Sequence, residues 1–288
     1  MKLFVFGLGY SASHFVSGLT AVDVAGTKRA PQKAPEAGVE ILAFDGARAD
    51  AAIARRLDES DTLLVSVPPD DNGDPVMRCF RERLAASRWR AIVYLSTIGV
   101  YGDHGGAWVD ERSAARTTSP RGRARLKAEN AWRDFGRSVD APVHILRLAG
   151  IYGPGRNMLA KLRRGEAQRI VKPEQVFNRI HVADIAQAIG LTIEAKGQGD
   201  VWNVADDEPA PPQDVVAFAA DLLGLPAPPE VDFERAEMSA AARSFYGDNR
   251  RVSNAKLKRE LGFRPLYPTY REGLRALAAS GEAGSGLL

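Results

Sequence analysis

The stretch KLFVFGLGYSASHF, residues 2–15, decides the fold of this chain. Residues 2–6 form a short apolar run that ends at a glycine, and a helical pattern follows directly. Gly7 permits a tight turn, Gly9 lets the backbone approach a ligand closely, and Ala12 is small enough for the helix to pack on the strand. The order of strand, glycine turn and helix predicts the first unit of a doubly wound α/β fold.

Apolar runs and amphipathic segments alternate through the first two thirds of the chain. Further strands are expected at residues 22–27, 39–44, 61–67, 91–97, 142–150 and 200–206. Helices are expected at residues 47–57, 74–87, 120–138 and 181–195. Asp74 is expected to cap the second of these helices, with Pro75 in its first turn. Apolar strands separated by helices indicate a parallel sheet covered on both faces, with right-handed crossovers.

The alternation becomes weaker after Gly150, where turn-rich and proline-rich segments separate shorter helices. We therefore predict an α/β fold, a Rossmann-type doubly wound parallel sheet with a smaller C-terminal α/β lobe. The Rossmann domain is expected at 1–151 plus 181–205, and the smaller substrate-binding lobe at 152–180 plus 206–288. The lobe would cover the carboxyl ends of the strands, where ligands of open α/β sheets bind.

Composition excludes several classes of protein. The chain has 288 residues, and its 39 basic and 36 acidic residues are mostly interspersed and leave a net charge of +3. The single Cys79 rules out an internal disulfide framework. The first ten residues read as a strand rather than a signal peptide, and no apolar run reaches membrane-spanning length. We expect a soluble cytoplasmic protein with no metal site; a homodimer is left open.

Basic residues are concentrated in one segment, 112–137, and nucleic-acid binding was therefore weighed as a third hypothesis. Trp132 and Phe135 are the aromatic residues that interleave with the basic ones. Their spacing of three places both on one side of a helix, which is typical of residues that face the core. The segment therefore favours a solvated helix face or a site for a small anion over nucleic acid.

The glycine turn predicts a dinucleotide site, because unpaired N–H groups and the helix dipole favour a pyrophosphate there. An NAD site wants a carboxylate at the end of the second strand, but Thr27, Lys28 and Arg29 occupy that corner. NADP is therefore expected, with NAD as the alternative; a bland reading is that Lys28 and Arg29 only begin an exposed loop. The residues expected to contact the cofactor are Gly7, Gly9, Tyr10, Ser11, Ala12, Thr27, Arg29, Asp45, Ser66 and Val67.

Four further stretches occur in a recognisable order over nearly the whole length: YLSTIGVYGD (94–103), LRLAGIYGPGRN (146–157), RIHVADIAQAI (179–189) and NRRVSNAKLKRELGFRP (249–265). Together they resemble the extended short-chain dehydrogenase/reductase superfamily, which contains nucleotide-sugar epimerases, dehydratases and reductases. The chain is most similar to its atypical, NAD-dependent epimerase-like branch. The family's glycine loop usually reads G-x-x-G-x-x-G; the tighter spacing found here is still expected to bind pyrophosphate.

A second departure affects catalysis. The family carries a tyrosine and a lysine four apart, and alignment on Glu129 puts Arg121 at the tyrosine position and Arg125 at the lysine position. A tyrosine hydroxyl beside an ammonium can exchange a proton with a substrate, whereas arginine stays protonated and binds anions. The resemblance therefore implies the cofactor site more firmly than it implies the reaction.

Other residues are candidates for the missing chemistry. Thr97 matches the family's serine or threonine that hydrogen-bonds the reacting oxygen, and Tyr101 or Tyr152 could replace the lost acid. His181 and Asp184 are expected to order the loop and helix around them rather than to act in catalysis.

Two functional hypotheses follow. The first is an NADP-dependent oxidoreductase or epimerase-like enzyme that acts on a small anionic substrate such as a nucleotide sugar. Its anion clamp is expected to consist of Arg121, Arg125, Arg156 and Arg251, with Arg250 as a further member. The second is a non-catalytic NADP-binding protein that reports redox state to a partner.

Overall fold

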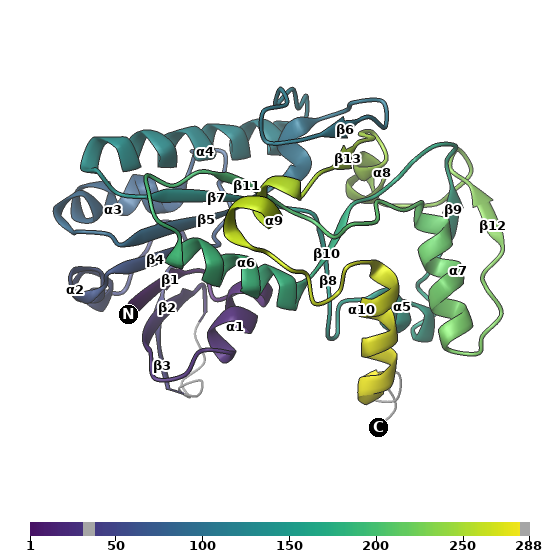
Figure 1. Ribbon diagram of the computed structural model, residues 1–288, viewed down its shortest axis with the longest axis horizontal. Helices are drawn as coiled ribbons and strands as arrows, with labels where there is room; N and C mark the ends of the chain where they lie inside the picture. Colours follow the sequence, from purple (N-terminus) through teal and green to yellow (C-terminus); the bar gives the residue numbers. More distant parts are fainter. Residues whose placement is uncertain (31–37, 283–288) are drawn as a thin grey trace.

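A computed structural model describes residues 1–30 and 38–282 and contains one seven-stranded parallel sheet (Figure 1). Its strand order is β11-β7-β5-β4-β1-β2-β3. The strands are β1 (Lys2–Phe6), β2 (Asp23–Lys28), β3 (Val39–Ala43), β4 (Thr62–Val65), β5 (Ala91–Thr97), β7 (Val143–Leu148) and β11 (Val201–Val204). The chain therefore runs outward from β1 in one direction and then from β4 in the other. This order confirms the predicted Rossmann-type fold.

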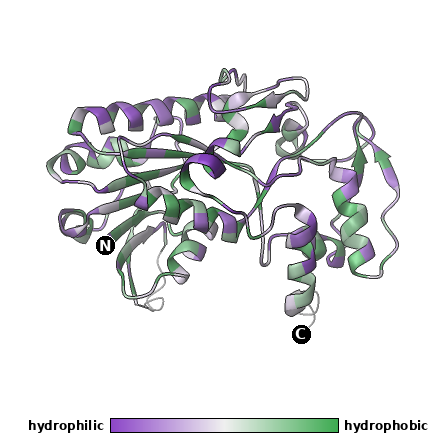
Figure 2. Ribbon diagram, viewed as in Figure 1, coloured by the Kyte–Doolittle hydropathy of each residue, from purple (hydrophilic) through white to green (hydrophobic). Residues whose placement is uncertain are grey.

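Helices cover both faces of the sheet, as Figure 1 shows. The flanking helices are α1 (Tyr10–Ser17), α2 (Ala52–Glu59), α3 (Pro75–Ala86), α4 (Pro120–Val139) and α6 (Val182–Glu194). Strand β1 explains the division, because successive side chains of a strand point to opposite faces. Leu3 and Val5 pack with α1 and α6, whereas Phe4 and Phe6 pack with α2, α3 and α4. The apolar strands in Figure 2 are thus buried on both sides.

The starts of α3 and α4 agree with the sequence. Asp74 Oδ1 accepts hydrogen bonds from the N–H groups of Val76 and Met77, and Asp74 Oδ2 accepts one from Trp132 Nε1 at 3.0 Å. The N-cap of one helix thus also fixes its neighbour. Ser119 caps α4, and Trp132 and Phe135 are fully buried, as their spacing predicts.

Shorter elements stand beyond the carboxyl ends of the large sheet (Figure 1). Those of the smaller lobe are β8 (Gly150–Tyr152), α5 (Met158–Arg163), β9 (Arg169–Val171), β10 (Arg179–His181), α7 (Pro212–Leu222), β12 (Glu230–Asp232), α8 (Ala240–Phe245) and α10 (Tyr270–Leu277). A core formed by α5, α7 and α10 holds this region together, and β12 pairs with β9.

One part of the C-terminal region returns to the large sheet. It consists of β13 (Arg251–Val252), which pairs with β6 (Trp108–Val109), and of α9 (Ala255–Leu261). Val252, Leu257 and Phe263 belong to the same hydrophobic core as strand β1. The return of this segment brings a C-terminal loop against the end of β5.

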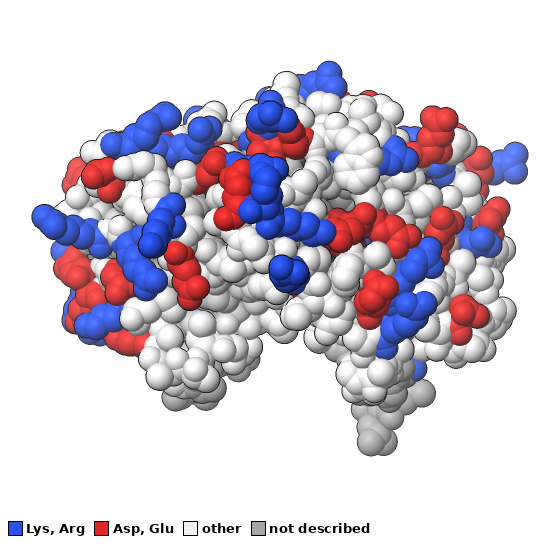
Figure 3. Space-filling view, in the orientation of Figure 1, with Lys and Arg blue, Asp and Glu red and all other residues white. Residues whose placement is uncertain are grey.

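Two surface properties bear on function. Acidic and basic side chains are interspersed over the face shown in Figure 3. In the part of the chain that the structure describes, no helix is both long and apolar enough to cross a membrane.

Candidate functional site

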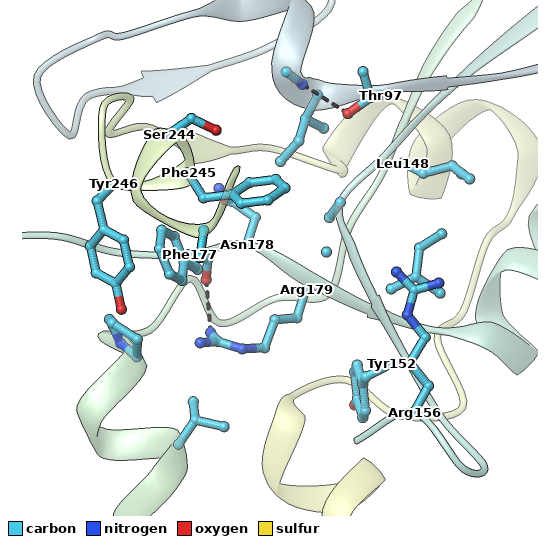
Figure 4. Close-up of a pocket in the computed structure, with 18 of the residues that line it drawn as sticks. Thr97, Leu148, Tyr152, Arg156, Phe177, Asn178, Arg179, Ser244, Phe245 and Tyr246 are labelled. Atoms are coloured by element: carbon cyan, nitrogen blue, oxygen red, sulfur yellow. Dashed lines mark hydrogen bonds between the residues drawn. The ribbon is translucent and has the colours of Figure 1, made fainter. Parts of the chain in front are cut away.

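A cavity of about 1190 Å³ lies at the carboxyl ends of β4, β5 and β7. At one end it reaches Ser11 in the first turn of α1 and Ser66 after β4. It then passes Thr97 at the end of β5 and Leu148 at the end of β7, and it continues into the smaller lobe (Figure 4). The cavity therefore joins the glycine loop to the region that the sequence assigns to substrate.

The glycine loop has the geometry of a phosphate-binding turn. Gly7 has a positive φ of 89°, and a Cβ there would lie 2.9 Å from Val67 Cγ2, so any other side chain would strain the turn. A Cβ on Gly9 would meet nothing within 4 Å, because that side of the loop is open. Ala12 is fully buried between α1 and the sheet. The first N–H groups of α1 have no partners within the helix, so this loop fits a pyrophosphate.

Thr27 has a different contact from the one predicted. It is 1% exposed, and its Oγ1 accepts a hydrogen bond from the Gly7 N–H at 2.9 Å. Its carbonyl oxygen accepts a second bond from the Leu8 N–H at 2.8 Å. Thr27 therefore holds the glycine loop on β2 and is buried away from the surface where a ribose phosphate would lie.

A separate hollow of about 300 Å³ lies beyond the ends of β2 and β3, and its lining includes Arg29, Asp45 and Arg48. Asp45 Oδ1 accepts hydrogen bonds from the N–H groups of Ala47 and Arg48, which keep the pKa of this carboxyl below its usual value. Arg29 and Arg48 bring two guanidinium groups to the same hollow. Arg48 was not predicted, since its three-residue offset from Asp45 has no recognised meaning in the sequence.

Tyr10 links the glycine loop to the loop after β8. Its hydroxyl donates a hydrogen bond to the carbonyl of Pro154 at 2.8 Å. The guanidinium carbon of Arg156 lies 5.8 Å from the centre of the Tyr10 ring, and Arg156 also lines the cavity. Gly153 permits this approach, because a Cβ there would lie 2.7 Å from the Tyr10 hydroxyl. Tyr10 and Arg156 thus stand together at the α1 end of the cavity.

The predicted catalytic residues are separated by the structure. Thr97 lines the cavity, and its Oγ1 accepts a hydrogen bond from the Gly99 N–H at 3.1 Å. Tyr101 is fully buried, and its hydroxyl donates to Asn203 Oδ1 at 2.8 Å. Burial raises the pKa of Tyr101. Its hydroxyl therefore faces the interior, whereas Thr97 remains at the cavity.

Tyr152, the other candidate acid, points toward the smaller lobe. A Cβ placed on Gly273 of α10 would lie 2.0 Å from the Tyr152 hydroxyl, so this glycine admits the ring. The ring also packs edge-on to His181 at 5.2 Å. Burial raises the pKa of Tyr152, which makes it a poor source of a proton near neutral pH.

The two arginines at the positions of the missing pair differ from each other. Arg125 Nη1 donates to the Leu95 carbonyl at 2.7 Å and to the Tyr94 hydroxyl at 3.2 Å. Arg121, one turn earlier, is exposed and lines the cavity. Arg125 is therefore bound to the end of β5, and Arg121 remains available to solvent and ligand.

Glu129, on which this alignment rests, is 1% exposed and forms a buried ion pair with Arg147 at 2.8 Å. Ser96 donates a hydrogen bond to Glu129 at 2.5 Å. Arg147 also stacks on Tyr101, with its guanidinium carbon 4.8 Å from the ring centre. This network joins β5, α4 and β7 immediately behind Thr97.

Two other arginines predicted for the anion clamp have structural partners. Arg251 donates to the Gly106 carbonyl within the contact of β13 with β6 and does not line the cavity, so its predicted role in the clamp is wrong. Arg250 lines the cavity but donates to the Gly102 carbonyl at 2.6 Å and pairs with Asp248 at 3.0 Å.

The structural roles expected for His181 and Asp184 are confirmed. His181 Nδ1 accepts a hydrogen bond from the Ala183 N–H, and burial lowers the pKa of His181 to about 4. Asp184 accepts hydrogen bonds from the N–H groups of Leu266 and Tyr267. Burial raises the pKa of Asp184 to about 6.

Several cavity residues were missed by sequence reasoning. Arg179, Phe245, Tyr246 and Tyr270 all line the part of the cavity in the smaller lobe. Arg179 lies inside the RIHVADIAQAI stretch, but only the two histidine-side neighbours of that motif drew attention. The aromatic residues come from segments far along the chain, and their approach depends on how the chain returns.

Comparisons with known proteins agree with this architecture. The profile of the NAD dependent epimerase/dehydratase family matches residues 76–205. Protein YeeZ from Escherichia coli (strain K12) is 29% identical over 219 residues, which cover 73% of each chain.

Solved structures extend the similarity over almost the whole chain. A functionally unknown conserved protein from Silicibacter pomeroyi DSS is 45% identical, with a TM-score of 0.85 and coverage of 98% of this chain and 99% of that one. UDP-glucuronic acid 4-epimerase from Bacillus cereus, solved in complex with NAD, is 18% identical, with a TM-score of 0.79 and coverage of 97% and 96%. At this identity the second similarity is one of fold.

Proposed function

The chain belongs to the NAD-dependent epimerase/dehydratase family within the extended short-chain dehydrogenase/reductase superfamily, and we propose that it is an NADP-preferring oxidoreductase or epimerase-like enzyme with an anionic substrate. The observation that carries the proposal is the continuous cavity from Ser11 at the start of α1 to Thr97 and on to the smaller lobe. A cofactor at one end and a substrate at the other could meet beside Thr97.

The chain's own residues would hold the dinucleotide in a definite way. The open side of Gly9 and the first N–H groups of α1 would bind the pyrophosphate, and Arg156 at the same end would add a positive charge. Ser66 and Val67 would lie beside the ribose on the nicotinamide side. When bound, the nicotinamide would supply or accept a hydride.

The preference for NADP is supported by the hollow at the ends of β2 and β3. Arg29 and Arg48 both line it, and a 2′-phosphate could take charge-assisted hydrogen bonds from either guanidinium. Asp45 lines the same hollow, but one of its oxygens is already occupied by two backbone N–H groups. The role of Thr27 in this proposal is to hold the glycine loop.

Proton transfer remains the weakest part of the catalytic chemistry. Thr97 Oγ1 could hydrogen-bond a substrate oxygen, with water as the proton carrier. Arg125 would contribute a fixed positive charge behind it. The second candidate function, a non-catalytic NADP-binding regulator, is supported by the burial of the Tyr101 and Tyr152 side chains, since neither offers an acidic phenol beside Thr97.

A titration of the purified chain with NADPH and NADH tests the cofactor site. NADPH is expected to bind more tightly than NADH, and Arg29→Ala combined with Arg48→Ala to weaken NADPH binding by about tenfold or more without affecting NADH. Gly9→Ala should weaken binding of both by about tenfold, because its methyl group would occupy the open side of the loop.

The matched control is Gly190→Ala in α6, where a Cβ also meets nothing within 4 Å. It should bind both cofactors as the unmodified chain does. Equal affinities for NADPH and NADH would remove the NADP preference, and binding of neither would remove the whole proposal. Thr97→Val then separates the two functions: loss of NADPH consumption at unchanged affinity supports the enzyme, whereas no consumption with any anionic carbonyl compound supports the regulator.

A further inference from the structure

Arg179 in β10 lies at the end of the cavity farthest from the glycine loop. Its Nη1 donates to the carbonyls of Phe177 at 2.9 Å and Ala210 at 3.1 Å, and these two bonds fix the guanidinium (Figure 4). The guanidinium carbon also lies 5.8 Å from the centre of the Tyr270 ring. Arg179 is thus a rigid cation that is set deep in the cavity wall.

The positive charge of Arg179 is poorly balanced by the protein. Within residues 1–30 and 38–282, no carboxylate oxygen comes close enough to its guanidinium to form an ion pair. Asp206 is the first charge partner in its surroundings, but Asp206 is 2% exposed and burial raises its pKa well above the usual value. Arginine stays charged when buried, so a desolvated cation here favours an anion from the cavity.

Phenol groups surround the same point. Tyr246 is 8% exposed, lines the cavity, and is held by ring contacts with Phe177 at 5.0 Å and Phe233 at 5.1 Å. Figure 4 shows Tyr246 and Arg179 at the same end of the cavity, away from Thr97. The Tyr270 hydroxyl is buried and has no hydrogen-bond partner among the described residues. A guanidinium with nearby phenol donors suits a carboxylate.

The other cations of the cavity have partners or lie at its edge. Arg250 pairs with Asp248 at 3.0 Å, and Arg164 pairs with Glu166 at 2.9 Å. Lys161 is exposed on α5. The deep end therefore offers one unbalanced positive charge, which matches a single carboxylate better than a diphosphate.

The wall between this charge and Thr97 is apolar. Phe245 of α8 is 64% exposed, and Figure 4 shows its ring projecting into the cavity. Residues Met158, Val215, Val216 and Leu274 line the same region. An exposed aromatic ring facing a cavity is typical of a surface that binds an apolar or aromatic group.

We propose that the deep end of the cavity is a carboxylate subsite formed by Arg179 and Tyr246, for a substrate acid whose apolar, aromatic-sized body packs against Phe245. The proposal rests on the proposed function for the rest of the cavity, because the far end of such an acid would lie beside Thr97. It narrows the anionic substrate from a nucleotide sugar to an apolar carboxylic acid.

Calorimetric titration of the full chain with 3-phenylpropionate and its neutral amide tests the subsite. The acid is expected to bind about tenfold more tightly than the amide. Arg179→Gln should abolish this difference, and Tyr246→Phe should reduce it several-fold while leaving the amide unchanged. Tyr246→Phe keeps the ring contacts, so it remains informative if Arg179→Gln does not fold. Arg164→Gln at the rim is the control and should leave both affinities unchanged.

The proposal is overturned if acid and amide bind equally, if neither binds, or if UDP binds more tightly than the acid and depends on Arg179. Titration of the same samples with NADPH separates this failure from that of the proposed function. NADPH binding without acid binding removes only the subsite, whereas acid binding without NADPH binding removes only the cofactor proposal.

Discussion

Arg125 illustrates how a substitution at a catalytic position can become a structural contact. Its guanidinium donates to the Leu95 carbonyl and the Tyr94 hydroxyl, and both of these residues are buried in β5. A lysine would place one ammonium there instead of a planar fork that reaches both acceptors. The arginine therefore ties α4 to the strand that carries Thr97, and it gives up the mobility that a proton-transfer partner would need.

This contact predicts unequal effects for the two arginines. Arg125→Met should destabilise the fold by about 2–4 kcal/mol, because it leaves two buried oxygen atoms without donors. Arg121→Met, one turn away on the exposed side, should change stability by less than about 0.5 kcal/mol. Urea unfolding of both variants measures the difference. Equal stabilities would mean that Arg125 does not hold the end of β5.

Single residues were predicted well where their role depended on local sequence. Asp74 as an N-cap and Gly7 in a tight turn follow from neighbours one to three positions away. Thr27 and Arg251 were misjudged because their partners are distant in sequence. Thr27 bonds to Gly7, and Arg251 bonds to Gly106, and no pattern along the chain marks either contact.

At the scale of elements, the ion pair of Glu129 with Arg147 fastens α4 to β7 behind the site. Both side chains are almost fully buried, and the Ser96 hydroxyl joins them to β5. Removing one member of a buried pair leaves the other as an unbalanced charge, and this costs far more than the pair itself contributes.

Glu129→Leu and Arg147→Met should each destabilise the protein by about 3–5 kcal/mol, and the double variant by clearly less than the sum. A double-mutant cycle from chemical unfolding gives the coupling. The exposed pair of Arg83 with Asp58, also 2.8 Å long, is the control, and Arg83→Met should cost less than about 1 kcal/mol. Additive losses at Glu129 and Arg147 would contradict the role of this pair.

The elements themselves were largely predictable. Apolar runs gave the strands of the large sheet, because strands buried on both faces have no polar side to obscure the pattern. The small paired strands of the lobe, such as β9 with β12, could not be predicted in the same way. They are three residues long, and their pairing joins Ile170 to Val231 across sixty positions of sequence.

At the scale of the whole molecule, the cavity forms because two parts of the chain that follow different rules meet at one edge of the sheet. The Rossmann half could be predicted from its glycine loop and its alternation of strands and helices. The deep end, with Arg179 and Tyr246, could not be, since it needs β10 and the end of α8 to approach across more than sixty residues. The cofactor end was therefore anticipated in more detail than the substrate end.

Buried histidines couple the stability of the molecule to pH. His144 joins β7 to β11, where its Nδ1 accepts a hydrogen bond from Trp202 Nε1 at 3.1 Å, and His181 packs against Tyr152 and Tyr267. Burial lowers the pKa of each histidine to about 4. Since the unfolded chain binds these protons near pH 6.5, stability is present above that pH and is lost as pH falls toward 4.

Between pH 7.5 and 5 each histidine should therefore remove about 2 kcal/mol of stability. Asp184 acts in the opposite sense, because its pKa of about 6 means that the folded state gains a proton first, and it returns about 1 kcal/mol over the same range. His144→Asn keeps an acceptor for Trp202 but cannot be protonated, so its stability should fall by about 2 kcal/mol less than that of the unmodified chain. Unfolding free energies at the two pH values measure this difference, and an unchanged pH dependence would mean that His144 is already protonated in the fold.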